Sequence, residues 1–446
     1  MSTVTSKPYD TQQVPSNKLK DTNRDVRMRR TDMRSTAHAL LFSCLCASVV
    51  VADDYEIILD SYNELELVAG LGQQEDVNGW LPAIEGANAL QVELSNTHMT
   101  MADAAGNLYL VDKESHAVLK MTLDGKMHTV VGTHLAGNGG DAPQLGTSVA
   151  LSNPNGLYVL PEGTAYILDR DNDKIRRLGP NGIVRTVVPD TLPLNAGRGL
   201  WVSSDETTIF YTASTVVRRW TEPTGVTVYA SGFGSLGNID VDPTDGNLVV
   251  TDRGAHRVYR VFSDGSRELI AGDGTTQNHG DGGPATNAGL DEVRGIAFLP
   301  HGGYFLATQG DGDIWYVDTN RVAHEFIKGS GSSSPLPHDE VCEPRGISIA
   351  PWGDLIITEN DHAVIRVVRR KLAISSVTVQ PSGAVQMMWY SMPSMNYAVQ
   401  FTEDMMHTNW QTLTDMPGGV ANILTTYNDT NAVGRQKAFY RVRTTP

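Results

Sequence analysis

The sequence predicts an all-β protein, in which a six-bladed β-propeller precedes a small C-terminal β-sandwich. A pattern of four short strands recurs every 40 to 57 residues between residues 64 and 370. Gly and Asp mark the turns of this repeat, and no amphipathic helical pattern of useful length interrupts it. The chain has 446 residues, 40% of them apolar, a composition that excludes disorder, coiled coils and polytopic membrane proteins.

The N-terminal region is typical of an export signal. Residues 1–36 carry eight Lys and Arg against four Asp and Glu, and we expect them to form a disordered basic leader. Residues 37–52 (AHALLFSCLCASVVVA) form an apolar run that ends just before Asp53-Asp54, as in a secretory signal peptide. The run is shorter than the roughly 20 residues of a membrane span. We therefore predict cleavage after Ala52, export to the extracellular space, cell surface or periplasm, and no stable span after cleavage; an uncleaved anchor is the alternative.

Charge and cysteine content narrow the range of partners. Beyond the leader the chain has 27 basic and 47 acidic residues, whereas nucleic acids and anionic lipid surfaces require a basic footprint. We therefore expect no nucleic-acid partner. Cys342 is the one cysteine left after cleavage, so no intramolecular disulfide is expected, and we interpret Cys342 as a small buried residue rather than a reactive thiol.

The first strand of the propeller is predicted to close its last blade. Residues 64–70 (ELELVAG) match a fourth strand such as residues 268–272 (ELIAG), but three partner strands do not precede them. The sixth repeat supplies three strands, at residues 345–350, 354–359 and 363–368, before the chain leaves the propeller. A shared last blade would protect both sheet edges that are otherwise exposed.

The second strand of each repeat is the clearest sign of the blades. Four copies end in an acidic residue and two are weaker: 108–112 (LYLVD), 165–169 (AYILD), 248–252 (LVVTD), 355–359 (LIITE), 209–213 (IFYTA) and 304–308 (YFLAT).

Blade four and the linker after it carry a family resemblance. The motifs are Asp245-Gly246-Asn247, then LVVTD and His256-Arg257-Val258, followed by residues 280–285 (GDGGPA), of which residues 137–143 are a degraded copy. Residues 64–370 resemble the NHL-repeat propellers, strongly in blades one, two, four and six and weakly in blades three and five. The resemblance implies the six-bladed fold. Members include ligand-binding sensors, protein-interaction scaffolds, RNA binders with a basic face and a metal-assisted lyase, and related folds include metal-dependent lactonases.

Residues 373–446 are predicted to form a separate β-sandwich. Trp389 on the second strand and Phe439-Tyr440-Arg441-Val442 on the last resemble a fibronectin type III-like domain, although 74 residues are few against about 100 for an immunoglobulin-type sandwich. We interpret Trp389, Trp410 and Tyr440 as core residues rather than a carbohydrate platform.

The predicted ligand face lies where the innermost strands begin. In a four-stranded antiparallel blade, this end shares one face with the turn after the second strand and with the linker to the next blade. The first residues of the innermost strands are expected to be Thr97, Asn155, Arg198, Gly237, Arg294 and Arg345, with an uncertainty of one residue in blades one and four. We predict ligand binding by Arg198, Arg294, Arg345, Asn155 and Thr97. The arginines either pair with carboxylates of adjacent turns or recognise a carboxylate or sulfate, for example on an acidic sugar.

Metal ligands and catalytic residues are not evident. Residues 169–173 (DRDND) have the alternation of a calcium loop, but the twelfth position is Pro180, so an Asp-rich turn is the preferred interpretation. His116, His256 and His362 occupy similar turns, which lie too far apart around a ring to share one zinc ion. We predict no cofactor, with calcium or another divalent ion left open, and identify no catalytic residue.

The preferred function is that of an exported binding or scaffold protein. Its partner would be an extracellular or periplasmic protein, an anionic glycan or another small ligand bound at the loop face. The alternatives are a metal-dependent hydrolase or lyase, similar to the lactonases, at the mouth of the propeller channel, and a structural cell-surface module.

Overall fold

The computed structural model describes residues 54–72, 78–189, 192–194, 197–330, 340–372, 374–390, 396–403, 410–417, 424–433, 435 and 438–445. The predicted leader (1–36) and apolar signal region (37–52) lie outside these described residues. Among the described residues, no helix combines the length and apolar character that crossing a membrane requires.

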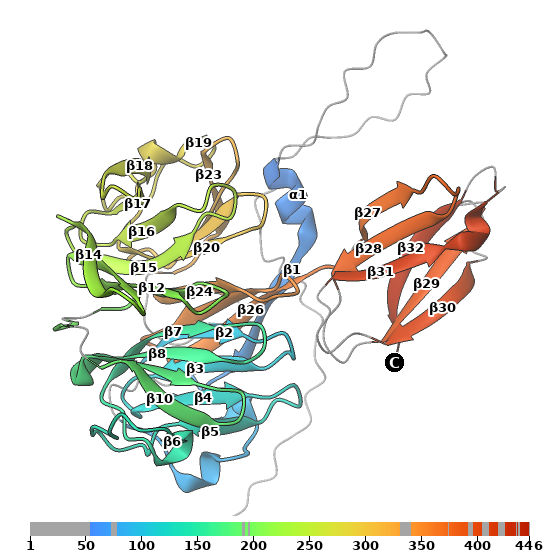
Figure 1. The fold of residues 1–446 in the computed structure, drawn as a ribbon. Coiled ribbons are helices and arrows are strands. Elements are labelled where there is room, and N and C mark those ends of the chain that lie inside the picture. The colour runs from blue at the N-terminus through green and yellow to red at the C-terminus, as the bar shows by residue number, and fades with distance from the viewer. Residues whose placement is uncertain are drawn as a thin grey trace, which may run out of the picture. The chain divides into compact units, whose positions relative to one another are not determined.

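Six antiparallel sheets form the blades of the propeller (Figure 1), as predicted. The strands of each blade are given from the innermost outward. Blade one contains β2 (Thr97–Ala102), β3 (Leu108–Asp112), β4 (Ala117–Met121) and β5 (Met127–Val131), and blade two contains β7 (Pro154–Val159), β8 (Ala165–Asp169), β9 (Lys174–Leu178) and β10 (Ile183–Val188). Blade three contains β11 (Leu200–Val202), β12 (Thr208–Ala213), β13 (Val216–Thr221) and β14 (Gly225–Ser231).

Blades four to six continue the same order around the ring. Blade four contains β15 (Leu236–Val241), β16 (Leu248–Asp252), β17 (Arg257–Val261) and β18 (Arg267–Ala271), and blade five contains β20 (Val293–Phe298), β21 (Tyr304–Thr308), β22 (Ile314–Val317) and β23 (Val322–Ile327). Blade six contains β24 (Pro344–Ile349), β25 (Leu355–Glu359), β26 (Val364–Arg370) and β1 (Tyr62–Ala69). The innermost strands contact one another in sequence, from β2 through β7, β11, β15 and β20 to β24, which contacts β2 again. The ring is therefore closed.

The N-terminal strand completes blade six, as the sequence predicts. β1 pairs with β26 in antiparallel register, with Leu65 opposite Val368. A helix that the sequence analysis did not predict, α1 (Asp54–Ser61), precedes it. The Tyr55 hydroxyl of α1 donates a hydrogen bond to the carbonyl oxygen of Glu325 at 3.0 Å. The N-terminal segment is thus attached to blade five as well as to blade six.

Two Gly-rich linkers cover the outer edges of the blades that follow them. The short strand β6 (Gln144–Leu145) pairs with β10 in blade two, and β19 (Gly283–Pro284) pairs with β23 in blade five. Each adds a fifth strand, which satisfies backbone groups that would otherwise face solvent at a sheet edge.

The core lies between the blades. Strands β3, β8, β16, β21 and β25 are buried along their whole length. A strand covered on both faces buries every side chain, which explains why these segments read as nearly continuous apolar runs rather than as alternating patterns. Four of these strands are exceptions at their last residue, which is acidic: Asp112, Asp169, Asp252 and Glu359. These buried carboxyl groups hold neighbouring segments together, as described in the next subsection.

In the described residues after 373, two three-stranded sheets form a sandwich. One sheet contains β27 (Ile374–Val379), β28 (Val385–Tyr390) and β31 (Leu424–Asp429), and the other β30 (Gln411–Pro417), β29 (Asn396–Thr402) and β32 (Phe439–Thr445). Trp389 is fully buried between them, with its ring 6.2 Å from that of Tyr397. The Arg441 guanidinium lies 4.3 Å from the Trp410 ring centre, and the Tyr440 hydroxyl donates to Asp429 at 3.0 Å.

Candidate functional site

Buried carboxylates bring the starts of the innermost strands to one face of the propeller. Asp112, Asp169 and Asp252 each end a second strand, and each accepts a hydrogen bond from a backbone N–H 17 residues earlier in the chain. The donors are Ser95 at 2.9 Å, Ser152 at 2.8 Å and Ser235 at 2.8 Å. These bonds hold the segment before the innermost strand against the turn after the second strand, and they satisfy the buried carboxylates.

A β-bulge at the start of the innermost strands sets the positions of the candidate residues. The register shifts between Pro154 and Gly156, between Val293 and Gly295, and between Pro344 and Gly346. The unpaired residues in these bulges are Asn155, Arg294 and Arg345. A bulge inserts one unpaired residue and redirects its side chain, and bulges are common beside binding sites.

The same register corrects the prediction for blade one by one residue. Thr97 pairs with Asp112, as Pro154 pairs with Asp169, and the shift falls between Thr97 and Met99. His98 therefore occupies the bulge. The Thr97 hydroxyl instead donates to the carbonyl oxygen of Glu359 at 2.7 Å, which links blades one and six.

Glycines allow the innermost strands to approach one another closely. A Cβ atom at Gly156 would lie 2.5 Å from the carbonyl oxygen of Arg198, and one at Gly346 would lie 2.7 Å from that of His98. A Cβ at Gly237 would likewise lie 2.7 Å from the carbonyl oxygen of Arg294. The residues after Asn155 and Arg345 must therefore be glycine for these backbones to converge.

We call His98, Asn155, Arg198, Arg294 and Arg345 the axial cluster. The Arg345 Nη1 atom lies 3.2 Å from His98 Nε2. Burial lowers the pKa of Arg198 to about 9, with further lowering by the charges of Arg253 and Arg294. The pKa of Arg345 falls to about 10 through burial and the charge of Arg294. The structure thus brings the predicted arginines of three blades together.

Arg253 is a fourth cation of this site and was not predicted. It follows Asp252 in the turn of blade four, and its Nη1 lies 3.8 Å from Glu292 Oε1. The sequence feature that could have identified Arg253 is its position directly after Asp252, at the end of a second strand. The turn after a second strand opens onto the same face as the starts of the innermost strands.

Carboxylates neutralise part of this charge. Glu292 Oε2 lies 2.5 Å from Arg294 Nη2, and Asp361 Oδ1 lies 3.6 Å from Arg345 Nη2. Glu292 and Glu343 have φ of +48°, a left-handed conformation that suits glycine or asparagine better than glutamate. In blades one and two Asn96 and Asn153 take this position. The strained backbone at Glu292 and Glu343 therefore occurs where a carboxylate lies beside an arginine.

Pairing leaves donors of the cluster unused. Arg294 is 6% exposed, and its Nε and Nη1 atoms are buried without a hydrogen-bond partner among the described residues. The Nε atom of Arg345 is likewise buried without a hydrogen-bond partner among the described residues. A buried guanidinium without acceptors is costly, so these N–H groups offer binding energy to an anion.

The uncharged members of the cluster complete its chemistry. Burial, and then the charge of Arg345, hold the pKa of His98 well below its usual value, so the imidazole is neutral. The Asn155 amide donates to the carbonyl oxygen of Gly197 at 2.7 Å, and its Oδ1 is buried without a partner in the described part of the chain. The Asn238 amide of blade four lies 3.3 Å from the carbonyl oxygen of Arg345 and 3.9 Å from Met99 Sδ, and so connects three innermost strands.

The predicted calcium-like segment of blade two holds its carboxylates apart. Asp169 accepts from Arg176 Nε at 3.0 Å, Asp171 from Arg170 at 2.7 Å, and Asp173 from the backbone N–H of Leu194 at 2.7 Å. Each carboxylate therefore has its own protein partner, as expected for an Asp-rich turn.

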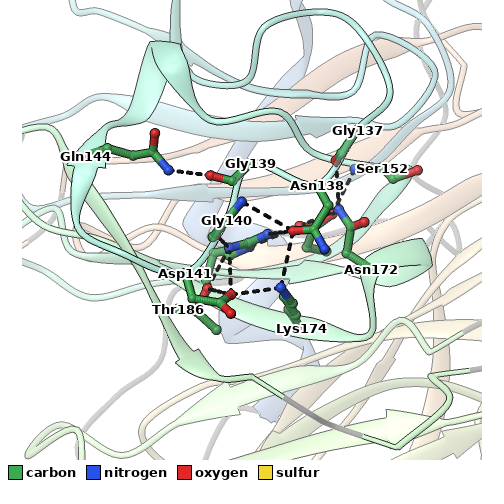
Figure 2. A network of polar contacts seen from close by, with 12 residues as sticks. Gly137, Asn138, Gly139, Gly140, Asp141, Gln144, Ser152, Asn172, Lys174 and Thr186 are labelled. Atoms are coloured by element: carbon green, nitrogen blue, oxygen red, sulfur yellow. Dashed lines mark hydrogen bonds and ion pairs between the residues drawn. The ribbon is translucent and has the colours of Figure 1, made fainter.

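The guanidinium of Arg176 fixes the Gly-rich linker of blade two. Arg176 is 1% exposed, and it donates to Thr186 Oγ1 at 2.5 Å and to Asn138 Oδ1 at 3.1 Å. Figure 2 shows Asn138, Asp141, Lys174 and Thr186 gathered in this network, in which Lys174 Nζ lies 2.8 Å from Asp141. The side chains of Arg176 and Lys174 thus occupy the space between the acceptor oxygens of this linker.

Two of the three turn histidines connect neighbouring blades. His116 Nδ1 accepts from the backbone N–H of Asn153 at 3.2 Å, and His256 Nδ1 from that of Glu292 at 3.0 Å. This agrees with the expectation of turn packing.

The third turn histidine belongs to a buried trio with metal-ligating side chains. In blade six, Cys342, Glu359 and His362 are buried, and one ligand atom of each lies within 4.8 Å of the others. Cys342 precedes Glu359 by 17 residues, as Ser95 precedes Asp112, and Glu359 pairs with the buried Arg366. The trio is therefore the blade-six form of the carboxylate contact described above.

No known protein family matches the chain, and no curated protein matches it. Solved structures share its fold. A protein of unknown function from Bacteroides thetaiotaomicron has a TM-score of 0.55 at 15% identity, over 69% of this chain and 76% of that one. An auxiliary nutrient binding protein from the same organism has a TM-score of 0.51 at 12% identity, over 68% and 76%. A streptogramin B lyase covers 70% of this chain and 99% of its own at 12% identity, with a TM-score of 0.46. At these identities the first two show a propeller fold and no more.

Proposed function

We propose that this protein is an exported binding protein that holds an anionic group of its ligand at the axial cluster. The observation that carries the proposal is the convergence of Arg198, Arg294 and Arg345 from three blades, with buried N–H groups of Arg294 that find no acceptor among the described residues. The planar guanidinium matches carboxylate and sulfate groups, and burial strengthens such charge-assisted hydrogen bonds. Acidic glycans are the ligand class that fits this chemistry outside the cell.

The proposal also assigns the propeller and the C-terminal sandwich to specific domain types and the N-terminal region to an export signal. We assign residues 64–370 to the NHL type because of the motifs at residues 245–247, 256–258 and 280–285. We assign residues 373–446 to a fibronectin type III-like domain that acts as a spacer or adhesion module. Export follows from residues 37–52, which read as a signal peptide. An auxiliary nutrient binding protein with a similar propeller agrees with a binding role, although that likeness concerns the fold alone.

The alternative of a metal-dependent hydrolase or lyase finds less support at the axis. A divalent cation such as calcium requires several oxygen ligands, most of them carboxylates. The axial cluster instead carries guanidinium groups, and the carboxylates beside it, Glu292 and Asp361, are already paired with Arg294 and Arg345. Fixed positive charges repel a divalent cation, so the site favours an anion.

The test is the double variant Arg294→Ala with Arg345→Ala, which removes the guanidinium groups of two adjacent blades. We expect its affinity for anionic glycans to fall by at least about tenfold, since charge-assisted bonds are lost, while binding of neutral glycans stays unchanged. The matched control is Arg185→Ala on β10, because Arg185 is exposed. Circular dichroism checks the fold. Equal binding of anionic glycans by the double variant and the control would overturn the proposal.

A further inference from the structure

Blade six differs from blades one, two and four at the contact between the turn after the second strand and the segment before the innermost strand. In those three blades, the residue 17 positions before the acidic residue is serine, whereas in blade six it is Cys342. The third residue after the acidic residue is serine, asparagine or alanine there, whereas in blade six it is His362. The acidic residue itself changes from Asp to Glu359. In blade six, all three positions of the contact therefore carry side chains that commonly bind metal ions.

Hydrogen bonds satisfy the same contact in blades one and two. The Ser95 hydroxyl donates to the Asp112 carboxylate at 3.0 Å, and the Ser115 hydroxyl donates to the carbonyl oxygen of Asp112 at 3.2 Å. In blade two, the Asn172 amide lies 2.9 Å from both carboxylate oxygens of Asp169. Neutral side chains thus supply the donors that these buried acceptors require.

The carboxylate of blade six is less well satisfied. Glu359 is fully buried, and its Oε1 atom pairs with Arg366. Its Oε2 atom is buried without a hydrogen-bond partner among the described residues. The thiol of Cys342 is a weak donor, and its Sγ atom lies 3.2 Å from Ser330 Oγ. Because a buried acceptor without a donor is costly, a cation at this contact would compensate Glu359 Oε2.

The three side chains of blade six are close enough to share one ion. Cys342 and Glu359 are fully buried and His362 is 2% exposed, and one ligand atom of each lies within 4.8 Å of the other two. Ligand atoms about 2.0–2.3 Å from a tetrahedral zinc ion lie roughly 3.3–3.8 Å from one another. Side-chain shifts of about 1 Å would therefore complete the geometry. Sulfur and imidazole ligands suit zinc, whereas calcium and magnesium require oxygen ligands.

The charge at this contact suits a divalent cation, unlike the charge at the axial cluster. A cysteine binds zinc as the thiolate, so the Cys342 thiol would release its proton to solvent. The thiolate and the Glu359 carboxylate then bring two negative charges to the ion. Arg366 keeps its contact with Glu359, in the way that ligating carboxylates are usually hydrogen-bonded by a neighbouring group.

We propose that Cys342, Glu359 and His362 bind one zinc ion, which holds the turn after β25 against the segment before β24. The ion takes the place of the hydrogen bonds in blades one and two. Its role is structural, because all three ligands are buried. The Ser330 hydroxyl or a water molecule completes the four ligands that zinc prefers. This site is separate from the axial cluster and does not depend on the proposed function.

Cobalt is the first probe, because its absorption spectrum reports the ligands directly. The parent protein for the test is the whole chain with Cys44→Ser and Cys46→Ser and without a histidine tag, so that Cys342 is its one cysteine. Bound metal is removed with EDTA and dialysis before cobalt chloride is added. We expect one cobalt ion per chain, with the near-ultraviolet thiolate-to-cobalt charge-transfer band and the visible bands of four-coordinate cobalt. Zinc chloride should abolish both signals.

A double variant gives blade six the side chains of blade one. Cys342→Ser with His362→Ser places serine where Ser95 and Ser115 stand in blade one. We expect zinc affinity, measured by competition with a chromogenic chelator, to fall at least about hundredfold, since the loss of a partner outside the ligand set alone costs roughly tenfold to a hundredfold. Zinc at about a hundredfold excess over its Kd should raise the Tm of the parent by at least about 5 °C and leave that of the double variant unchanged.

The matched control is His116→Asn, which removes a turn histidine outside the trio. Asparagine keeps an acceptor for the backbone N–H of Asn153 and suits the left-handed backbone at this position, where φ is +51°. Its zinc affinity should equal that of the parent.

Two results would overturn the inference. The first is a parent protein that binds no cobalt, or binds it without the thiolate band, and this result counts whether or not the double variant folds. The second is a zinc affinity of the folded double variant equal to those of the parent and of His116→Asn.

Discussion

At the scale of single residues, the site depends on glycines as much as on arginines. Each candidate residue in the bulge of blades two, five and six is followed by a glycine, at positions 156, 295 and 346. The carbonyl oxygen of Arg198 occupies the space where a side chain at Gly156 would lie. The positions of the guanidinium groups therefore follow from how closely the backbones approach one another.

We expect Gly156→Ala to destabilise the propeller. Its Cβ would lie 2.5 Å from the Arg198 carbonyl oxygen and 2.6 Å from Leu168 Cδ1. Overpacking of this kind costs about 1–3 kcal/mol. Thermal unfolding should therefore show a Tm lower by several degrees, at roughly 2–4 °C per kcal/mol for a domain of this size.

The matched control for this variant is Gly79→Ala. A Cβ at Gly79 meets only the flexible side chain of Glu93, at 3.3 Å, and the backbone there is not left-handed. It should leave the Tm unchanged or raise it slightly, because alanine restricts the unfolded chain. A Tm of Gly156→Ala equal to that of Gly79→Ala would contradict the close-approach argument.

At the scale of elements, the closing strand β1 holds blades five and six together. It covers the outer edge of β26, and its first residue, Tyr62, is buried with Phe305 and Phe326 of blade five. One short segment thus bridges the first and last parts of the propeller sequence.

Deleting residues 53–72 should open the ring. The loss exposes the edge of β26 and the apolar residues around Tyr62, so we expect a decrease of at least about 5 kcal/mol, on the order of a whole domain's free energy of unfolding. Chemical denaturation measures it. Deleting residues 1–52 instead is the control and should leave stability unchanged. A melting curve of the 53–72 deletion that matches the control would rule out closure by this strand.

At the scale of the whole molecule, buried carboxyl groups govern the response to pH. Burial raises the pKa values of Asp112 and Asp313 to about 7 and that of Asp240 to about 6. A carboxyl whose pKa is higher in the folded than in the unfolded state binds more protons when folded. Its contribution to stability therefore decreases as the pH rises from about 4, the unfolded value, towards about 7.

We expect the Tm to fall between about pH 6.5 and about pH 8, since this window spans the raised carboxyl pKa values, whereas below it the lowered pKa of the buried His98 acts in the opposite direction. Carboxyls with lowered pKa values, such as Asp205, act only below about pH 4. Asp112→Asn keeps an acceptor for Ser95 and should flatten the decline, whereas Asp205→Asn should not change it. A Tm that rises steadily from pH 5 to pH 8 would contradict the assignment.

The sequence by itself determined the propeller, the number of its blades and the strand that closes it. These features are local, because the short apolar strands, the Gly and Asp turns and the unpaired copy at residues 64–70 can all be recognised along the chain. Arg198, Arg294 and Arg345 were predicted because the repeat places them at equivalent positions.

Only the tertiary structure decided which side chains share the site. The bulge that places His98 rather than Thr97 at the site depends on pairing across the blade, and the contacts of Arg253 with Glu292 and of Arg345 with Asp361 join separate turns. Such contacts depend on how closely neighbouring blades pack, which residue order does not encode locally. Burial then keeps His98 neutral and raises the pKa of Glu343, and burial is a property of the closed ring.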